Sequence, residues 1–260
     1  MIVAGSSLLY TQQSLPKAVE NLANLGFTAV DIGAIEGWAH IDPSTLGDDI
    51  AETAEHIETA CEAAGVRPVA FNAGMNTDSV DTECTYLRHL ATVAERLDID
   101  VITLQGGSPD SDLEADFGRF RDLTESIGSF DVQLTVETHW GTHLEDPAVA
   151  ATYPKEVPGL GLTLDPGHFA IGPHWDDGFA NLLEDVVHVH ARQAGDGWEN
   201  VQRSPDGGKI DFESLLVDLE AVGYDGAVTV EYIDSLDGVA ATDAVTWAKQ
   251  MRELLASQLE

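Results

Sequence analysis

The chain has 260 residues, of which 46 are acidic and only 12 are basic, so that its formal net charge is −34 at pH 7. This imbalance argues against a nucleic-acid-binding protein, which needs clustered Lys and Arg to displace counterions from phosphates, and equally against binding to anionic membranes. It is typical of halophilic proteins, in which concentrated salt screens self-repulsion, and we therefore predict a salt-loving source with an acidic proteome.

The length also matches the roughly 250 residues of a (β/α)8 barrel and predicts one domain over residues 1–260. The apolar runs are all shorter than the roughly 20 residues that span a bilayer, and the first ten residues lack the regions of a secretory signal. We therefore expect a cytoplasmic protein. Cys61 and Cys84 stand outside any CxxC or CxxH spacing and are interpreted as packing residues.

Strand-like and helical patterns alternate along the chain at intervals of about 30 residues, which is typical of an α/β fold. In the first helix, Ser14 is the expected N-cap and Gly26 the C-cap; in the seventh, Asp211 and Gly223 have these roles. The chain has neither GxGxxG nor a P-loop motif, which disfavours an open nucleotide-binding sheet. We therefore predict a single (β/α)8 TIM barrel. The eight predicted strands are 2–5, 28–33, 66–72, 101–105, 132–137, 160–165, 186–191 and 227–232.

Side-chain alternation along the last four predicted strands places polar residues in the barrel lumen, because the apolar residues between them must face the helices. Glu137, Asp165, His190 and Glu231 thus stand near the C-terminal ends of adjacent strands, where barrel active sites are built. Three converging carboxylates repel one another unless a cation neutralises them. Their oxygens and one imidazole suit Mn²⁺, Mg²⁺ or Co²⁺, with Mn²⁺ favoured and Zn²⁺ as an open alternative.

Each of these acids, taken alone, is better explained as a solvated loop residue of a very acidic chain. Their joint occurrence directly after apolar strands favours the metal site. His188, one layer deeper in the lumen than His190, is expected to be a packed and hydrogen-bonded core residue rather than a ligand. Asp31, also on the lumen side, is a candidate hydrogen-bond partner at that depth.

The segments VETHWGTHLEDP, LDPGH, HVHARQ and VTVEY occur in this order at the strand ends. They resemble the xylose-isomerase-like barrel superfamily of sugar isomerases, epimerases and inosose dehydratases. The resemblance implies that Glu137, Asp165, His190 and Glu231 bind the metal and that His168 binds substrate. It also implies that Glu137 and Glu231 act as acid and base through an enediolate of a sugar or a related polyhydroxy carbonyl compound. Such barrels often pair, so a homo-oligomer is one expected state.

The chain departs from the family pattern after the seventh predicted strand. Gln193 stands where many relatives carry an acid, and Asp196 stands where sugar epimerases often place an arginine. Arg192 either supplies the missing positive charge to the substrate or forms a structural ion pair. The scarcity of Lys and Arg near these motifs argues against a phosphate clamp, so an unphosphorylated sugar, cyclitol or small keto acid is the expected substrate.

Loop residues and competing functions complete the prediction. Trp140 is expected in the wall of the substrate pocket, His139 and His143 are expected to face solvent, and segment 195–209 is a candidate lid.

Alternative functions are a dehydratase of a keto-cyclitol on the same metal site and a non-catalytic sugar-binding barrel. An abasic-site endonuclease is disfavoured. The endonucleases of the superfamily have more histidine ligands and a basic DNA groove, and this sequence has neither.

Overall fold

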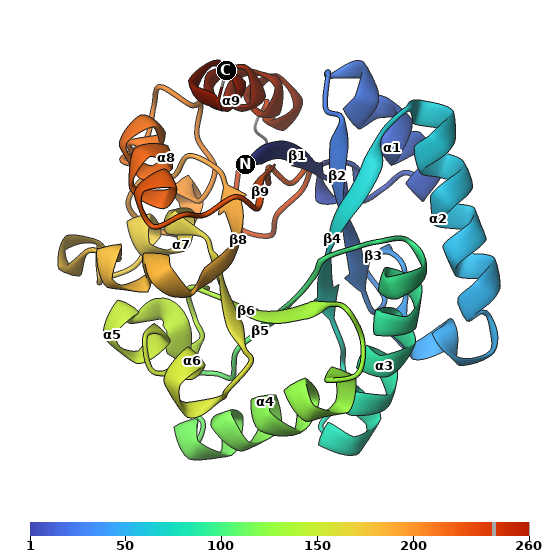
Figure 1. The fold of residues 1–260 in the computed structure, drawn as a ribbon. Coiled ribbons are helices and arrows are strands. Elements are labelled where there is room, and N and C mark those ends of the chain that lie inside the picture. The colour runs from blue at the N-terminus through green and yellow to red at the C-terminus, as the bar shows by residue number, and fades with distance from the viewer. Residues whose placement is uncertain (241–242, 260) are drawn as a thin grey trace.

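The computed structural model describes residues 1–240 and 243–259 and contains a closed barrel of eight parallel strands (Figure 1). Pairing between β1 and β2 closes the ring, and the remaining neighbours follow chain order. This arrangement confirms the predicted single (β/α)8 barrel. The strands are β1 Ile2–Ser6, β2 Ala29–Ile35, β4 Arg67–Gly74, β5 Val101–Gln105, β6 Gln133–Glu137, β7 Gly161–Leu164, β8 Val186–Ala191 and β9 Ala227–Val230.

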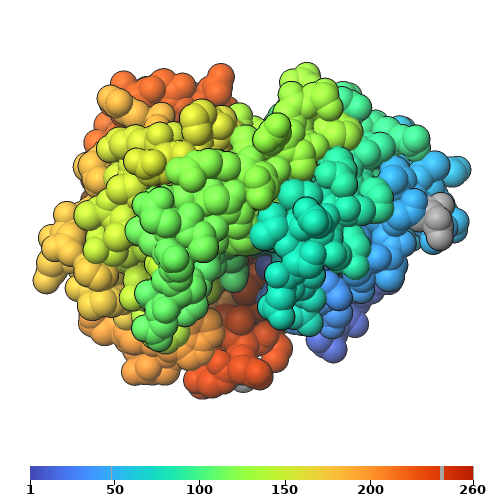
Figure 2. Space-filling model, turned by 90° about the horizontal axis from the view of Figure 1, so that it is seen from below, coloured from blue at the N-terminus to red at the C-terminus, as the bar shows by residue number. Residues whose placement is uncertain are grey.

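Helices surround the ring of strands and cover its apolar outer face (Figure 1). On one flank, α3 and α4 lie side by side (Figure 2). Among the described residues, no helix is both long and apolar enough to cross a membrane. The helices are α1 Leu15–Asn24, α2 Ile50–Ala64, α3 Val80–Arg96, α4 Leu113–Ile127, α5 Pro147–Ala150, α6 Tyr153–Glu156, α7 Pro166–Ile171, α8 Phe212–Ala221 and α9 Ala244–Leu259.

The ends of α1 and α8 follow the local signals of the sequence only in part. Asp211 accepts a hydrogen bond from the backbone N–H of Ser214 at 3.0 Å and so caps α8. Ser14 occupies the N-cap of α1, but its hydroxyl makes no capping hydrogen bond. The C-caps are Leu25 and Val222 rather than the expected glycines. Gly26 and Gly223 stand one residue further along, with φ of 91° and 84°, a left-handed conformation that other residues adopt only at a cost.

Two features of the fold differ from the sequence prediction. A two-residue strand, β3 Ala39–His40, pairs antiparallel with the end of β2, because Gly37 at φ 72° turns the chain back on itself. The connections on either side of β7 are made of the short helices α5, α6 and α7 and of 3₁₀ turns rather than long helices. Short runs of this kind are too brief to show a helical period in the sequence.

Alternation along β5, β6 and β7 produces a polar layer in the lumen. The hydroxyls of Thr103, Thr135 and Thr163 lie 2.7–3.0 Å from one another, and all three residues are fully buried. Two residues further along β6, on the same lumen face, is Glu137. The three hydroxyls therefore form a buried, hydrogen-bonded layer in the lumen, one residue pair below the C-terminal mouth of the barrel.

Candidate functional site

The four residues predicted to bind a metal meet at the C-terminal mouth of the barrel. Glu137 is the last residue of β6, Asp165 follows β7, His190 lies in β8 and Glu231 follows β9. Each offers a ligand atom, and these four atoms all lie within 4.8 Å of one another. None of the four residues is more than 3% exposed. Four strands that end at one mouth thus bring three carboxylates and an imidazole into one buried cluster.

Hydrogen bonds and ion pairs hold these side chains in place. His190 Nδ1 lies 2.7 Å from Glu137 Oε1 and 3.5 Å from Glu231 Oε1. Asp165 Oδ1 accepts a hydrogen bond at 2.7 Å from the backbone N–H of Gly167 at the start of α7. Asn72 of β4 donates from Nδ2 to Glu231 Oε1 at 2.8 Å. The sequence prediction missed Asn72, although its signal was a polar residue at the end of a predicted strand.

Arg192 lies inside the cluster rather than at its rim, and only 2% of it is exposed. Its Nη2 is 2.8 Å from Asp165 Oδ2, and its Nη1 is 3.4 Å from Glu231 Oε2. The same Nη2 lies 2.6 Å from His168 Nε2. A guanidinium only donates, so His168 Nε2 accepts and the proton of neutral His168 belongs on Nδ1. These contacts correspond to the ion-pair interpretation of Arg192.

Burial and mutual attraction change the pKa values of these groups in opposite directions. Burial raises the pKa of the Glu231 carboxyl to about 7, although the charge of His190 opposes the rise. Burial would also raise the pKa of Glu137, but His190, by its charge and its hydrogen bond, lowers that pKa below its ordinary value. Burial would lower the pKa of His190, yet the charges of Glu231 and Glu137 raise it well above its usual range. In the ion-free protein, protons therefore balance part of the charge of the carboxylates.

The donor set fits a divalent cation both in chemistry and in charge. Three carboxylates and the Arg192 guanidinium leave two negative charges, which one divalent ion neutralises when His190 is uncharged. Carboxylate oxygens with one imidazole nitrogen are ligands that Mg²⁺, Mn²⁺ and Co²⁺ accept. The residues present therefore fit a divalent cation, as the sequence predicted.

Metal affinity is expected to rise with pH between about 6 and 8, because protons on Glu231 and His190 compete with the ion. Glu231, with a pKa of about 7, loses its proton within this range, and His190 loses its proton at higher pH because its pKa is raised. Titration of the protein with Mn²⁺ at a series of pH values measures this dependence. An affinity that is constant from pH 6 to pH 8 would contradict it.

A cavity of 110 Å³ opens directly onto the cluster, and a second cavity of 370 Å³ adjoins it and shares Ile35, Trp38, Asn72 and Gln105 with it. Together they extend from the cluster towards β4 and β5 and have the size range of small-molecule sites, roughly 300–1,000 Å³. The smaller cavity is lined by Leu8, Ile35, Trp38, Asn72, Gln105, Glu137, His139, His168, Arg192, Trp198, Glu231, Ile233 and Leu236.

The prediction that His139 and His143, in the loop after β6, face solvent is wrong. The ring of His139 lies against that of His168, with centroids 3.7 Å apart, and lines the smaller cavity. His143 is buried, with Nε2 3.0 Å from Ser111 Oγ. Trp140 stacks at 5.6 Å on Trp198, which lines the cavity, while Trp140 itself is 39% exposed. His139 and His143 therefore face the interior, through the ring contact with His168 and the contact with Ser111.

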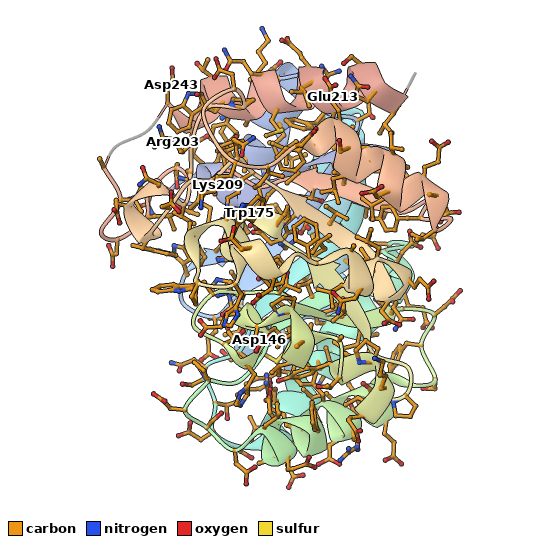
Figure 3. All side chains as sticks on the ribbon, turned by 90° about the vertical axis from the view of Figure 1, so that its left-hand side faces the viewer. Asp146, Trp175, Arg203, Lys209, Glu213 and Asp243 are labelled. Carbon is orange, nitrogen blue, oxygen red and sulfur yellow. The ribbon has the colours of Figure 1, made fainter. Side chains whose placement is uncertain are left out.

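The segment 195–209 after β8 covers one side of the cavity through Trp198. Lys209 anchors its far end: Nζ contacts a carboxylate oxygen of Asp196, lies 3.3 Å from the carbonyl oxygen of Ala170, and stands 5.8 Å from the centroid of the Trp175 ring. Figure 3 shows Lys209 and Trp175 close together. The segment is therefore tied to the connection between β7 and β8.

Deeper in the lumen, His188 has the surroundings of a structural histidine. It is 1% exposed, and its Nε2 lies 2.9 Å from Asp31 Oδ2 and 3.1 Å from the hydroxyl of Thr229. These contacts match the expectation of a packed, hydrogen-bonded residue with Asp31 as its partner.

The same fold occurs in solved proteins whose sequences are 15–17% identical to this chain. A xylose isomerase-like TIM barrel protein of Mycobacterium smegmatis, in complex with magnesium, has a TM-score of 0.79 at 15% identity, covering 99% of this chain and 96% of that protein. D-allulose 3-epimerase of Methylomonas sp. has a TM-score of 0.76 at 17% identity, with 99% and 98% covered. The probable 3-DHS dehydratase of Bacillus anthracis involved in petrobactin synthesis has a TM-score of 0.74 at 15% identity, with 98% and 99% covered.

The amino-acid sequence also matches the model of a protein family. The model, described as a xylose isomerase-like TIM barrel, matches residues 19–258. This range contains all four cluster residues and every motif on which the sequence resemblance rested. The chain therefore belongs to the xylose isomerase-like TIM barrel family.

Proposed function

We propose that the protein is a metal-dependent isomerase or epimerase that acts on a sugar or a related polyhydroxy carbonyl compound through an enediolate. The observation that carries this proposal is the position of Glu137 and Glu231. Both carboxylates border the cavity, they come from different strands, and they belong to the cluster that suits a divalent ion. This combination provides two proton-transferring groups beside a Lewis acid.

The chemistry divides between the metal and the side chains. Glu137, Asp165, His190 and Glu231 would hold a divalent ion, for which we favour Mn²⁺, and that ion would act as a Lewis acid on a carbonyl and the neighbouring hydroxyl of the substrate, making the C–H bond between them more acidic. One carboxylate removes that proton and the other returns a proton to the opposite face or to the adjacent carbon. Return to the opposite face is epimerisation, and return to the adjacent carbon is aldose–ketose isomerisation.

His168 is the proposed donor to a substrate oxygen. Arg192 occupies its Nε2, so neutral His168 has its proton on Nδ1, which is buried and lacks a hydrogen-bond partner in the described part of the chain. His168 lines the cavity, and burial lowers its pKa well below the ordinary value, which keeps the ring neutral. A neutral N–H donor stabilises negative charge as it develops on a substrate oxygen. Arg192 contributes to substrate binding by fixing this tautomer.

The cavity walls favour an unphosphorylated substrate. The guanidinium of Arg119 in the larger cavity is already paired with Glu83 at 2.6 Å and with Asp116 at 3.1 Å, so that it offers little charge to a phosphate. The ring of Trp198 offers an apolar face to a sugar, and Trp140 supports it by stacking. An unphosphorylated sugar, cyclitol or small keto acid therefore suits the site, whereas nucleic acid is disfavoured by the net charge.

Solvent proton exchange tests the proposal. Protein loaded with Mn²⁺ in concentrated KCl is incubated in D₂O with D-allulose, other ketohexoses and a keto-cyclitol, and deuterium incorporation at carbon is followed by NMR. Exchange is expected in the wild type, with a loss of roughly 10²–10⁴-fold or more in Glu137→Gln and Glu231→Gln, because each change removes an acid–base group and also weakens the metal site. Asp234→Asn changes an exposed acid three residues after Glu231 and is the matched control.

The outcomes separate the competing functions. Exchange together with loss of water identifies the alternative dehydratase, which would use the same site. Binding of a sugar without exchange would instead indicate a non-catalytic sugar-binding barrel and overturn the proposed enzyme.

A further inference from the structure

The segment 195–209 leaves the barrel after β8 and returns twice to the place where it began. In its middle, the backbone N–H of Arg203 donates to the carbonyl oxygen of Gln193 at 2.8 Å, and the two residues form an antiparallel bridge. At its end, the backbone N–H of Lys209 donates to the carbonyl oxygen of Ala194 at 2.9 Å. The segment is therefore a compact loop whose middle and end are both joined to its start.

The side chain of Gln193 lies between these two returns and is only 3% exposed. Its Nε2 donates to the carbonyl oxygens of Pro205 at 3.1 Å and Ile210 at 2.8 Å. Its Oε1 accepts from the backbone N–H of Ala194 at 3.2 Å and from that of Ile210 at 2.9 Å. The amide thus uses both of its hydrogens and both of its acceptor positions on the backbone. One side chain satisfies polar groups on both sides of the loop.

The surroundings of this amide are closely packed. A Cβ at Gly208 would overlap with Oε1 of Gln193 and with the carbonyl oxygen of Ala194, so that only glycine lets the chain pass here. The fully buried Tyr232 adds two further hydrogen bonds. Its hydroxyl donates to the carbonyl oxygen of Arg203 at 2.9 Å and accepts from the backbone N–H of Gln193 at 3.2 Å.

The part of the loop nearest the cavity contains Trp198, which lines the smaller cavity. Its Nε1 donates to the carbonyl oxygen of Asp237 at 2.8 Å, and its ring stacks on that of Trp140. The loops after β6, β8 and β9 therefore meet at this ring. In the described part of the chain, Gln193 lines neither of the two cavities. Any effect of Gln193 on a substrate must therefore pass through the wall that Trp198 forms.

We propose that Gln193 is a positioning residue: it ties segment 195–209 to the end of β8 and so holds the ring of Trp198 as a fixed wall of the substrate cavity. Its amide suits this role because it donates twice and accepts twice without a charge. A carboxylate here could not donate to the carbonyl oxygens of Pro205 and Ile210 and would place a negative charge against them. The tie itself is independent of the reaction, and only its kinetic test rests on the proposed function.

Hydrogen–deuterium exchange of the wild-type protein tests the tie first. The competing explanation is a lid that opens and closes, whose backbone amides would exchange nearly as fast as those of an unfolded chain. A fixed wall instead predicts that the amides of Arg203, Lys209 and Ile210 exchange at least about 100-fold more slowly than that. Exchange of these amides at the rate of an unfolded chain overturns the proposal without any variant.

Gln193→Glu is the main variant, because it keeps the shape of the side chain and removes its donors. The three amides are expected to exchange about 10-fold faster or more, since buried carbonyl oxygens lose their partner. The indole N–H signal of Trp198 in ¹H–¹⁵N NMR is expected to shift towards that of a free indole. Gln133→Glu is the matched control, because that amide also donates to two carbonyl oxygens, of Gly159 and Leu134, but at the start of β6. It is expected to leave both readouts unchanged.

The kinetic test separates positioning from chemistry. With D-allulose, or with the ketohexose that wild type turns over fastest, Gln193→Glu is expected to raise KM by about 10-fold. Its kcat is expected to stay within about threefold of wild type, because a wall contact binds substrate and transition state alike. Trp198→Ala is expected to show the same separation of KM from kcat. A kcat that falls at unchanged KM overturns the proposal, as does an unchanged KM in a variant whose loop exchanges faster.

The remaining outcomes are also decisive. A Gln193→Glu protein with the exchange rates and the indole signal of wild type contradicts the tie, as does a Gln133→Glu protein in which the loop exchanges equally fast. If Gln193→Glu does not fold, Gly208→Ala disturbs the same contact with the amide intact and is expected to give the same local loss of protection. If wild type turns over no sugar, the proposed function fails, and the exchange and indole measurements still test the role of Gln193.

Discussion

Replacing Glu231 with Gln is expected to reduce the metal content of the protein from about one divalent ion per chain to less than about a tenth. Loss of a residue that only orients a metal ligand already weakens metal binding by about 10–100-fold, and loss of a ligand weakens it at least as much. The substitution removes a charged ligand and leaves Glu137, Asp165 and Arg192 with one net negative charge, which no longer neutralises a divalent ion. His190→Ala is expected to have the same effect by removing the imidazole ligand. Elemental analysis of protein purified in concentrated salt and incubated with Mn²⁺ measures both.

Asp234→Asn is the control for the loss of an acid at the same mouth of the barrel. Asp234 is exposed and accepts a hydrogen bond from Thr11 at 2.7 Å, away from the cluster. This variant is expected to keep its ion, and circular dichroism should show the same fold in all three variants. A wild type that takes up none of Mn²⁺, Co²⁺ or Mg²⁺ would leave the acidic cluster without its proposed role.

Raising KCl from about 0.1 to about 3 M is expected to increase the melting temperature by roughly 10 °C, which for a domain of this size corresponds to roughly 3–5 kcal/mol. The reason is the net charge of −34, whose self-repulsion is screened over about 10 Å at 0.1 M salt but over about 3 Å at 1 M. Differential scanning calorimetry across the salt series measures the shift.

A charge-reduced variant distinguishes screening from other salt effects. Glu52, Glu55, Glu58 and Glu62 are exposed on α2, and their joint replacement by Gln removes four negative charges without touching the core. The variant is expected to need less salt for the same melting temperature. A melting temperature of the wild type that does not change between low and high salt would show that the halophilic interpretation is wrong.

The sequence by itself determined the barrel and the residues that converge in it. Side chains alternate with period two along a strand, so apolar Leu134 and Val136 placed Glu137 in the lumen without any knowledge of the neighbours. Parallel strands of a barrel end at one mouth, so residues that end successive strands meet there. These rules are local, and they sufficed to bring Glu137, Asp165, His190 and Glu231 together.

Only the tertiary structure decided what each side chain does within that mouth. Arg192 turns inward to Asp165 and Glu231, Asn72 reaches a carboxylate 159 residues away, and Asp31 reaches a histidine 157 residues away. Such contacts depend on rotamers and on the closing of the ring between β1 and β2, which no period along the chain encodes. The sequence therefore selects which residues meet, while the packing across the lumen decides which of their atoms face one another.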